Sequence, residues 1–90
     1  MNLTDINKAR IVRDGAIDAM EALNAALTEA IDGLDEADRR SLKMAFGRAM
    51  GEISVELIHP AVKAFPELEP SSLTWGAVAK SRAMVRAKAL

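Results

Sequence analysis

The chain has 90 residues, a length that suits one domain, and half of its residues are apolar, so it can bury a core. It contains no cysteine, which excludes disulfides, thiolate metal ligands and cysteine nucleophiles. No apolar run reaches the roughly 18 residues of a membrane-spanning helix, and the N-terminus lacks the basic start and apolar block of a signal peptide. We therefore expect a cytoplasmic protein of a single domain, residues 1–90, without a membrane contact.

The first predicted helix covers about residues 4–33. Thr4 is the expected N-cap, with Asp5 in the first turn, where the helix dipole favours a negative charge. Arg13 and Asn24 lie at the margin of the apolar stripe, where we expect both to reach water. The stripe recurs in alternating steps of four and three, as on one face of a long helix: Ala16, Met20, Leu23, Leu27, Ala30 and Leu34.

The second predicted helix covers about residues 36–58 and follows a short turn. Asp32 and Gly33 are expected to end the first helix, with Gly33 in the left-handed conformation that glycine tolerates. Asp35 is the expected N-cap of the second helix. Because only a few residues connect the two helices, they are predicted to pack antiparallel as a hairpin.

The second helix has apolar residues on two opposite sides, although a helix that covers a single core needs only one apolar stripe. Two glycines lie on one of these sides, and each costs a helix interior about 1 kcal/mol relative to alanine. We interpret this side as a surface for close approach of another helix, with a local bend as the alternative. The predicted homodimer interface consists of Met44, Gly47, Gly51, Ser54, Val55 and Ile58. If the chain is monomeric, the third helix would cover this side instead.

The C-terminal third of the chain is predicted to form a link and a third helix. Residues 59–71 form the link, since Pro60 disfavours helical geometry in the residue before it, and residues 61–65 can form another short helical turn within the link. Residues 72–88 form the helix, with Ser71 or Ser72 as its N-cap.

Charge is unevenly distributed along the chain. Residues 1–38 carry three basic and nine acidic side chains, whereas residues 71–90 carry four basic and no acidic ones. The basic end either docks against the acidic first helix or contacts an acidic partner or nucleic acid. Trp75 either closes the core or anchors a partner. The candidate contacts are Trp75, Lys80, Arg82, Arg86 and Lys88.

Few residues suggest catalytic chemistry. His59 is the only histidine, and Glu56 precedes it at the spacing that di-iron carboxylate bundles use. With Glu52 on the same side, a twofold copy could complete a metal site at a dimer interface; the alternative is a solvated Glu56 and an Arg48–Glu52 ion pair. No nucleophile elbow or phosphate-binding loop is present. We therefore predict no catalytic, cofactor-binding or metal-binding residues.

These patterns predict an all-α domain with a long antiparallel hairpin and a shorter C-terminal helix, assembled as a dimeric helical bundle. No motif assigns the chain to a family. We expect a non-enzymatic interaction module, an adaptor or regulator that acts through homodimerisation and helix-surface contacts with a protein partner. The alternatives are nucleic-acid binding through the basic C-terminal helix and, more remotely, the carboxylate–histidine metal site.

Overall fold

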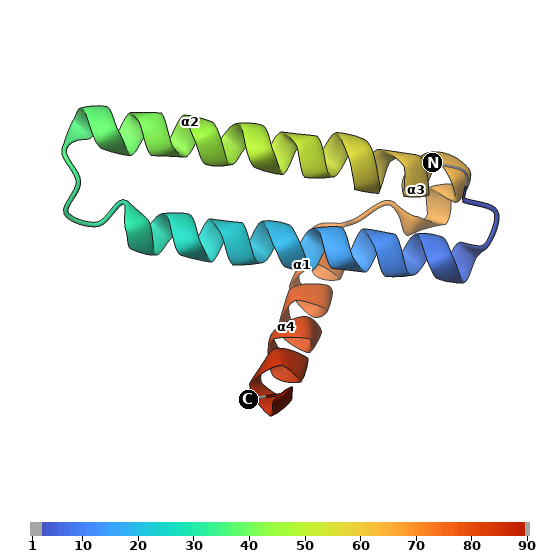
Figure 1. The fold of residues 1–90 in the computed structure, drawn as a ribbon. Helices are drawn as coiled ribbons and strands as arrows, with labels where there is room; N and C mark the ends of the chain where they lie inside the picture. Colours follow the sequence, from blue (N-terminus) through green and yellow to red (C-terminus); the bar gives the residue numbers. More distant parts are fainter. Residues whose placement is uncertain (1–2, 90) are drawn as a thin grey trace.

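The computed structural model describes residues 3–89, which form helices and connecting turns without a strand. The predicted all-α hairpin with a C-terminal helix is confirmed (Figure 1). The elements are α1 (Ile6–Ala30), α2 (Glu36–Ile53), the π-helical turn η1 (Ser54–Ile58), α3 (His59–Ala64), the 3-10 turn η2 (Pro66–Leu68) and α4 (Ser72–Ala89). Among these, α2, η1 and α3 follow one another as a single rod beside α1, and α4 leaves the hairpin at a steep angle (Figure 1).

The hairpin turn forms as its residues predict. Gly33 adopts a φ of 79°, the left-handed conformation that ends many helices. The Asp35 carboxylate accepts a hydrogen bond of 2.8 Å from the Asp38 backbone N–H, which satisfies a free donor at the start of α2. The N-cap of α1 is Asp5 and not Thr4, because the Asp5 carboxylate accepts from the Asn7 N–H at 2.8 Å.

The rod does not end before Pro60: a further short helix, α3, begins at His59, where the predicted link begins. A proline inside an α-helix removes one donor, and its ring collides with the carbonyl four residues earlier. Here the helix widens first: the N–H of His59 donates to the carbonyl of Ser54, five residues back. Pro60 then lies in the first turn of α3, a position that proline tolerates, and helical structure continues to Ala64.

Two small clusters form the core. The first joins Ala9, Ala61 and Leu68, with Phe65 packed against them at the open end of the hairpin. The second is centred on Ile17 of α1 and Ile58 of η1, and Trp75 and Val78 of α4 pack against it. The predicted third helix, α4, therefore docks on α1 and η1. Its N-terminus is capped by Ser71, whose hydroxyl accepts from the Thr74 N–H at 3.2 Å.

Arg13 holds the C-terminal link against α1. Contrary to the expectation that it reaches water, it is buried, with 9% of its surface exposed. Its Nη1 donates to the Leu68 carbonyl at 3.1 Å, and its Nη2 lies 2.8 Å from the Asp14 carboxylate. A buried carbonyl without a donor costs roughly 1–3 kcal/mol, so this long-range bond fixes η2 on the hairpin.

We predict that Arg13→Met lowers the free energy of unfolding by about 2 kcal/mol, because the apolar stem is kept but the Leu68 carbonyl loses its charged donor. Urea unfolding followed by circular dichroism measures this. The control is Arg10→Met on the same helix; Arg10 is exposed and reaches only Asn7, so it should change stability by less than about 0.5 kcal/mol. Equal effects of the two substitutions would contradict a structural role for Arg13.

Candidate interaction surface

The outer side of α2 is uncovered in the single chain. None of the 18 residues of α2 is buried, and Met44 is 57% exposed. Val55, in the π-helical turn η1 that follows α2, is 54% exposed. A Cβ atom added at Gly47 or Gly51 would meet nothing within 4 Å. The alternative that the C-terminal helix, α4, covers this side of α2 is therefore wrong. We call the exposed stripe the glycine face; it consists of Met44, Gly47, Gly51 and Val55.

Ser54 and Ile58 are predicted on the same side, but the structure places neither of them on it. A π turn has more residues per turn than an α-helix, so Ile58, at the end of the turn that begins at Ser54, lags behind its α-helical position. Ile58 is turned into the core and is only 6% exposed. Ser54 is half-buried and lines a groove with Trp75 of α4. An α-helical pattern applied to the sequence cannot show this rotation.

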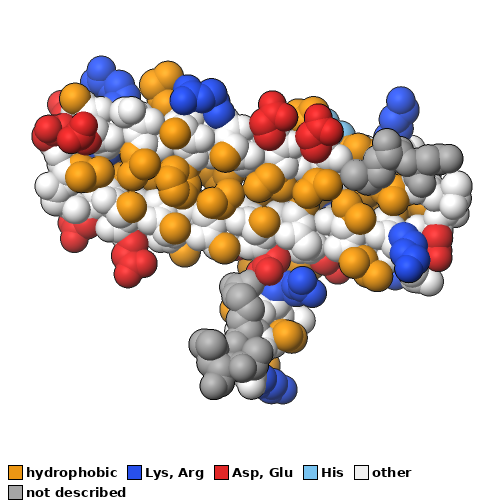
Figure 2. All heavy atoms as spheres, viewed as in Figure 1, with side chains coloured by type: hydrophobic (Ala, Val, Ile, Leu, Met, Phe, Trp, Pro, Cys, Tyr) orange, Lys and Arg blue, Asp and Glu red, His pale blue; other side chains and the backbone are white. Residues whose placement is uncertain are grey.

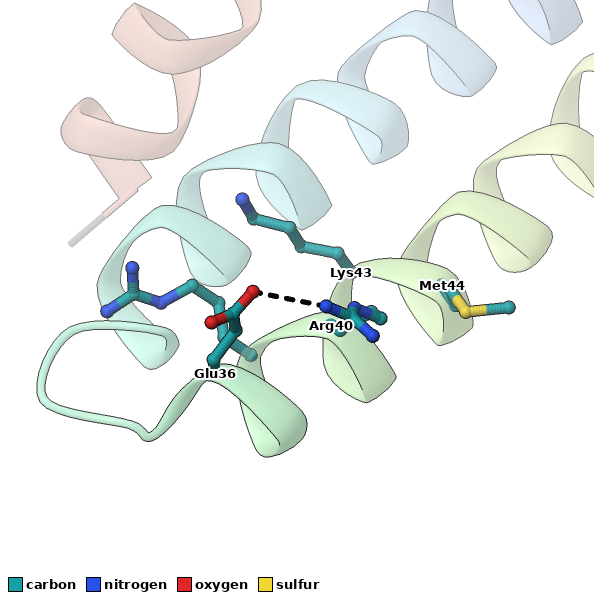
Figure 3. Close-up of a pocket in the computed structure, with 5 residues that line it drawn as sticks. Glu36, Arg40, Lys43 and Met44 are labelled. Carbon is teal, nitrogen blue, oxygen red and sulfur yellow. Dashed lines mark hydrogen bonds and ion pairs between the residues drawn. The ribbon is translucent and has the colours of Figure 1, made fainter.

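A shallow basic pocket adjoins the glycine face near the hairpin turn (Figure 3). Glu36 and Arg40 form an ion pair of 3.1 Å, one helical turn apart, and Lys43 and Met44 continue the same wall. The fifth lining residue, Arg39, donates to the Leu34 carbonyl at 3.4 Å. This group is not among the residues predicted from the sequence, although their spacing of three and four residues is a signal for it. Its positive side chains give one end of the glycine face a cationic margin.

The candidate partner residues of α4 separate onto different sides. Trp75 is half-buried against the second core cluster, as expected if it closes the core. Arg82 lies 3.8 Å from Asp18 of α1, so the basic end does meet the acidic helix. Lys80 and Lys88 are exposed and line a shallow groove on the other side. The side chain of Arg86 lies outside the described part of the structure. The described basic side chains thus form no single stripe.

The three residues of the alternative metal site do not form a cluster in the structure. Glu52, Glu56 and His59 are all exposed, and the π turn lies between the first of them and the last. Within residues 3–89, no group of three or more histidine or carboxylate side chains is placed to hold a metal ion. Arg48 and Glu52, expected to form an ion pair, are not among the ion pairs of the described residues.

No helix in the described part of the chain has both the length and the apolar character needed to traverse a bilayer. Comparisons with protein-family models, with curated proteins and with solved structures find no significant match.

We predict that Gly47→Ala raises the free energy of unfolding by about 1 kcal/mol, because alanine favours the helix interior and the space beside Gly47 is open. Gly33→Ala should lower it by about 1–2 kcal/mol, since φ is positive there. Urea unfolding measures both changes in stability. The protein concentration should be low enough that the unfolding midpoint no longer depends on it. Destabilisation by Gly47→Ala as large as by Gly33→Ala would show that the side of α2 is closed within one chain.

Proposed function

We propose that the protein is a cytoplasmic, non-enzymatic interaction module, an adaptor or regulator that forms a homodimer through the glycine face. The observation that carries the proposal is the bare outer side of α2, where large apolar side chains flank two exposed glycines. Glycines weaken a solvated helix, and they allow a second helix to approach closely. Both features are accounted for if another helix packs there.

The dimensions of the chain support this proposal. Its radius of gyration is 14.9 Å, against about 12 Å for a compact domain of this length. Its accessible surface is 6293 Å², roughly 1,200 Å² more than a compact monomer of the same mass exposes. A standard protein interface removes about 800 Å² from each partner. The uncovered surface is thus large enough for one such interface.

A second exposed stripe on α4 supports the adaptor role. Leu73 is 85% exposed, and Met84 and Val85 are also among the large exposed apolar residues. Lys80 and Lys88 line the groove beside Met84 and Val85. Because α4 projects away from the hairpin (Figures 1 and 2), this stripe stands apart from the glycine face. We propose that it offers a cationic, apolar helix surface to a different protein while the glycine face holds the dimer.

Sedimentation velocity over a range of concentrations tests the homodimer, with a dimer expected for the wild type. Gly51→Leu should convert it to a monomer, because a bulky side chain would separate the two helices. Since Gly51 is exposed with open space around it, the monomer should still fold, and circular dichroism checks this. The matched control is Ala45→Leu, at an exposed position elsewhere on α2, which should leave the dimer intact.

A wild type that remains monomeric at high concentration would overturn the proposed homodimer. A Gly51→Leu variant that is folded and fully dimeric would overturn the glycine face as its interface.

A further inference from the structure

We propose that the second copy packs on the glycine face in the antiparallel direction, about a twofold axis near residues 49–50. This inference rests on the proposed homodimer and adds its orientation and register. A twofold dimer uses the same patch on both copies, so in an antiparallel pair each residue of the glycine face and its edges meets the residue at the mirrored position along the rod. The facing side of the rod must then be complementary to itself when its direction is reversed.

The charges of the rod have this property. Residues 35–38 include three acidic side chains and no basic one, and residues 39–48 include four basic side chains and no acidic one. Glu52 and Glu56 follow, and Lys63 ends the series. Figure 2 shows the resulting order of red, blue, red and blue along the outer edge of the rod. Reversal about residues 49–50 places each group opposite a group of the other sign, whereas a parallel pair would place like charges together.

The apolar residues of the glycine face fit the same register. Gly47 comes to lie opposite Gly51 of the second copy, which brings the two backbones closest at the axis. Met44 comes to lie opposite Val55, so the two large exposed side chains of α2 and η1 cover each other on both sides of the glycines. The proposed contact is therefore centred on α2, which has no buried residue in the single chain.

Arg48 and Glu52 are the charged pair nearest the axis. They are exposed, lie one helical turn apart on the same edge, and form no ion pair with any residue that the structure describes. In the antiparallel register each Arg48 faces Glu52 of the second copy, so two equivalent pairs form across the axis. Opposite charges at an interface favour the correct orientation and suppress the wrong one.

The α4 helix of the same chain does not compete for this surface. Trp75 and Val78 attach it to Ile17 and Ile58, and the Arg82–Asp18 pair holds it to α1. The glycine face is thus free to receive a helix from another molecule, and the charge order of the rod selects a second copy.

Charge exchange tests the register. Arg48→Glu and Glu52→Arg should each raise the dimer dissociation constant about tenfold, since each places two like-charged pairs across the axis. The double variant Arg48→Glu/Glu52→Arg should return it to within about threefold of the wild type, because both pairs are restored in reverse. Arg10→Glu on α1 is the control and should leave association unchanged. A double variant as weak as the single variants would overturn the proposed pairing.

Distances between spin labels test the direction. The chain has no cysteine, so Glu36→Cys and Ala45→Cys each give one labelled site per copy. At 1.5 Å per residue, the antiparallel register separates the two copies of residue 36 by about 40 Å along the rod and those of residue 45 by about 13 Å. A parallel dimer gives short distances at both sites and would overturn the inference while leaving the homodimer intact. Absence of any dimer in sedimentation would overturn both.

Discussion

One turn of π-helix determines which side of the rod faces the protein and which side faces outward. In η1 the helix widens by one residue, and this rotates Ile58 into contact with Ile17. The same turn precedes Pro60, so the rod continues where a regular α-helix would be interrupted. Trp75 then packs against the surface that η1 and α1 present. The position of α4, and with it the separation of two exposed surfaces, depends on this turn.

The interior is small for a chain of this length, and polar contacts supplement it. The buried apolar residues are Ala9, Ala16, Ile17, Ile58, Ala61 and Leu68, and half of them are alanines, which each remove little area from water. In so small a core, the hydrogen bonds of a single buried arginine contribute a larger share of the stability. Arg13 ties η2 to α1 through the Leu68 carbonyl, and so it holds the link that positions α4. Much of α2 lies outside this interior, so apolar side chains such as Met44 stay exposed in the single chain.

The exposed surfaces differ in chemistry, and this suggests a division of roles. The glycine face is narrow, flanked by Met44 and Val55, and bordered by charges whose order is complementary to its own reverse. The outer stripe of α4 is apolar with Lys80 and Lys88 beside it, and it has no matching acidic series on the same helix. The first surface suits a second copy of the chain, whereas the second suits a different, acidic partner. If the proposed dimer forms, the two copies would present two such α4 surfaces, one for each of two partner molecules.

The sequence by itself determined the features that depend on neighbouring residues. The helices, the left-handed Gly33 and the Asp35 cap follow from local backbone and side-chain chemistry, and the short turn between the helices dictates the antiparallel hairpin. Only the tertiary structure decided the π turn, the burial of Arg13 and Ile58, and the docking of α4 on α1. Each of these depends on contacts between residues far apart in the chain, such as Arg13 with Leu68. Helical periodicity assumes a constant angle per residue, and it fails where packing favours a wider turn.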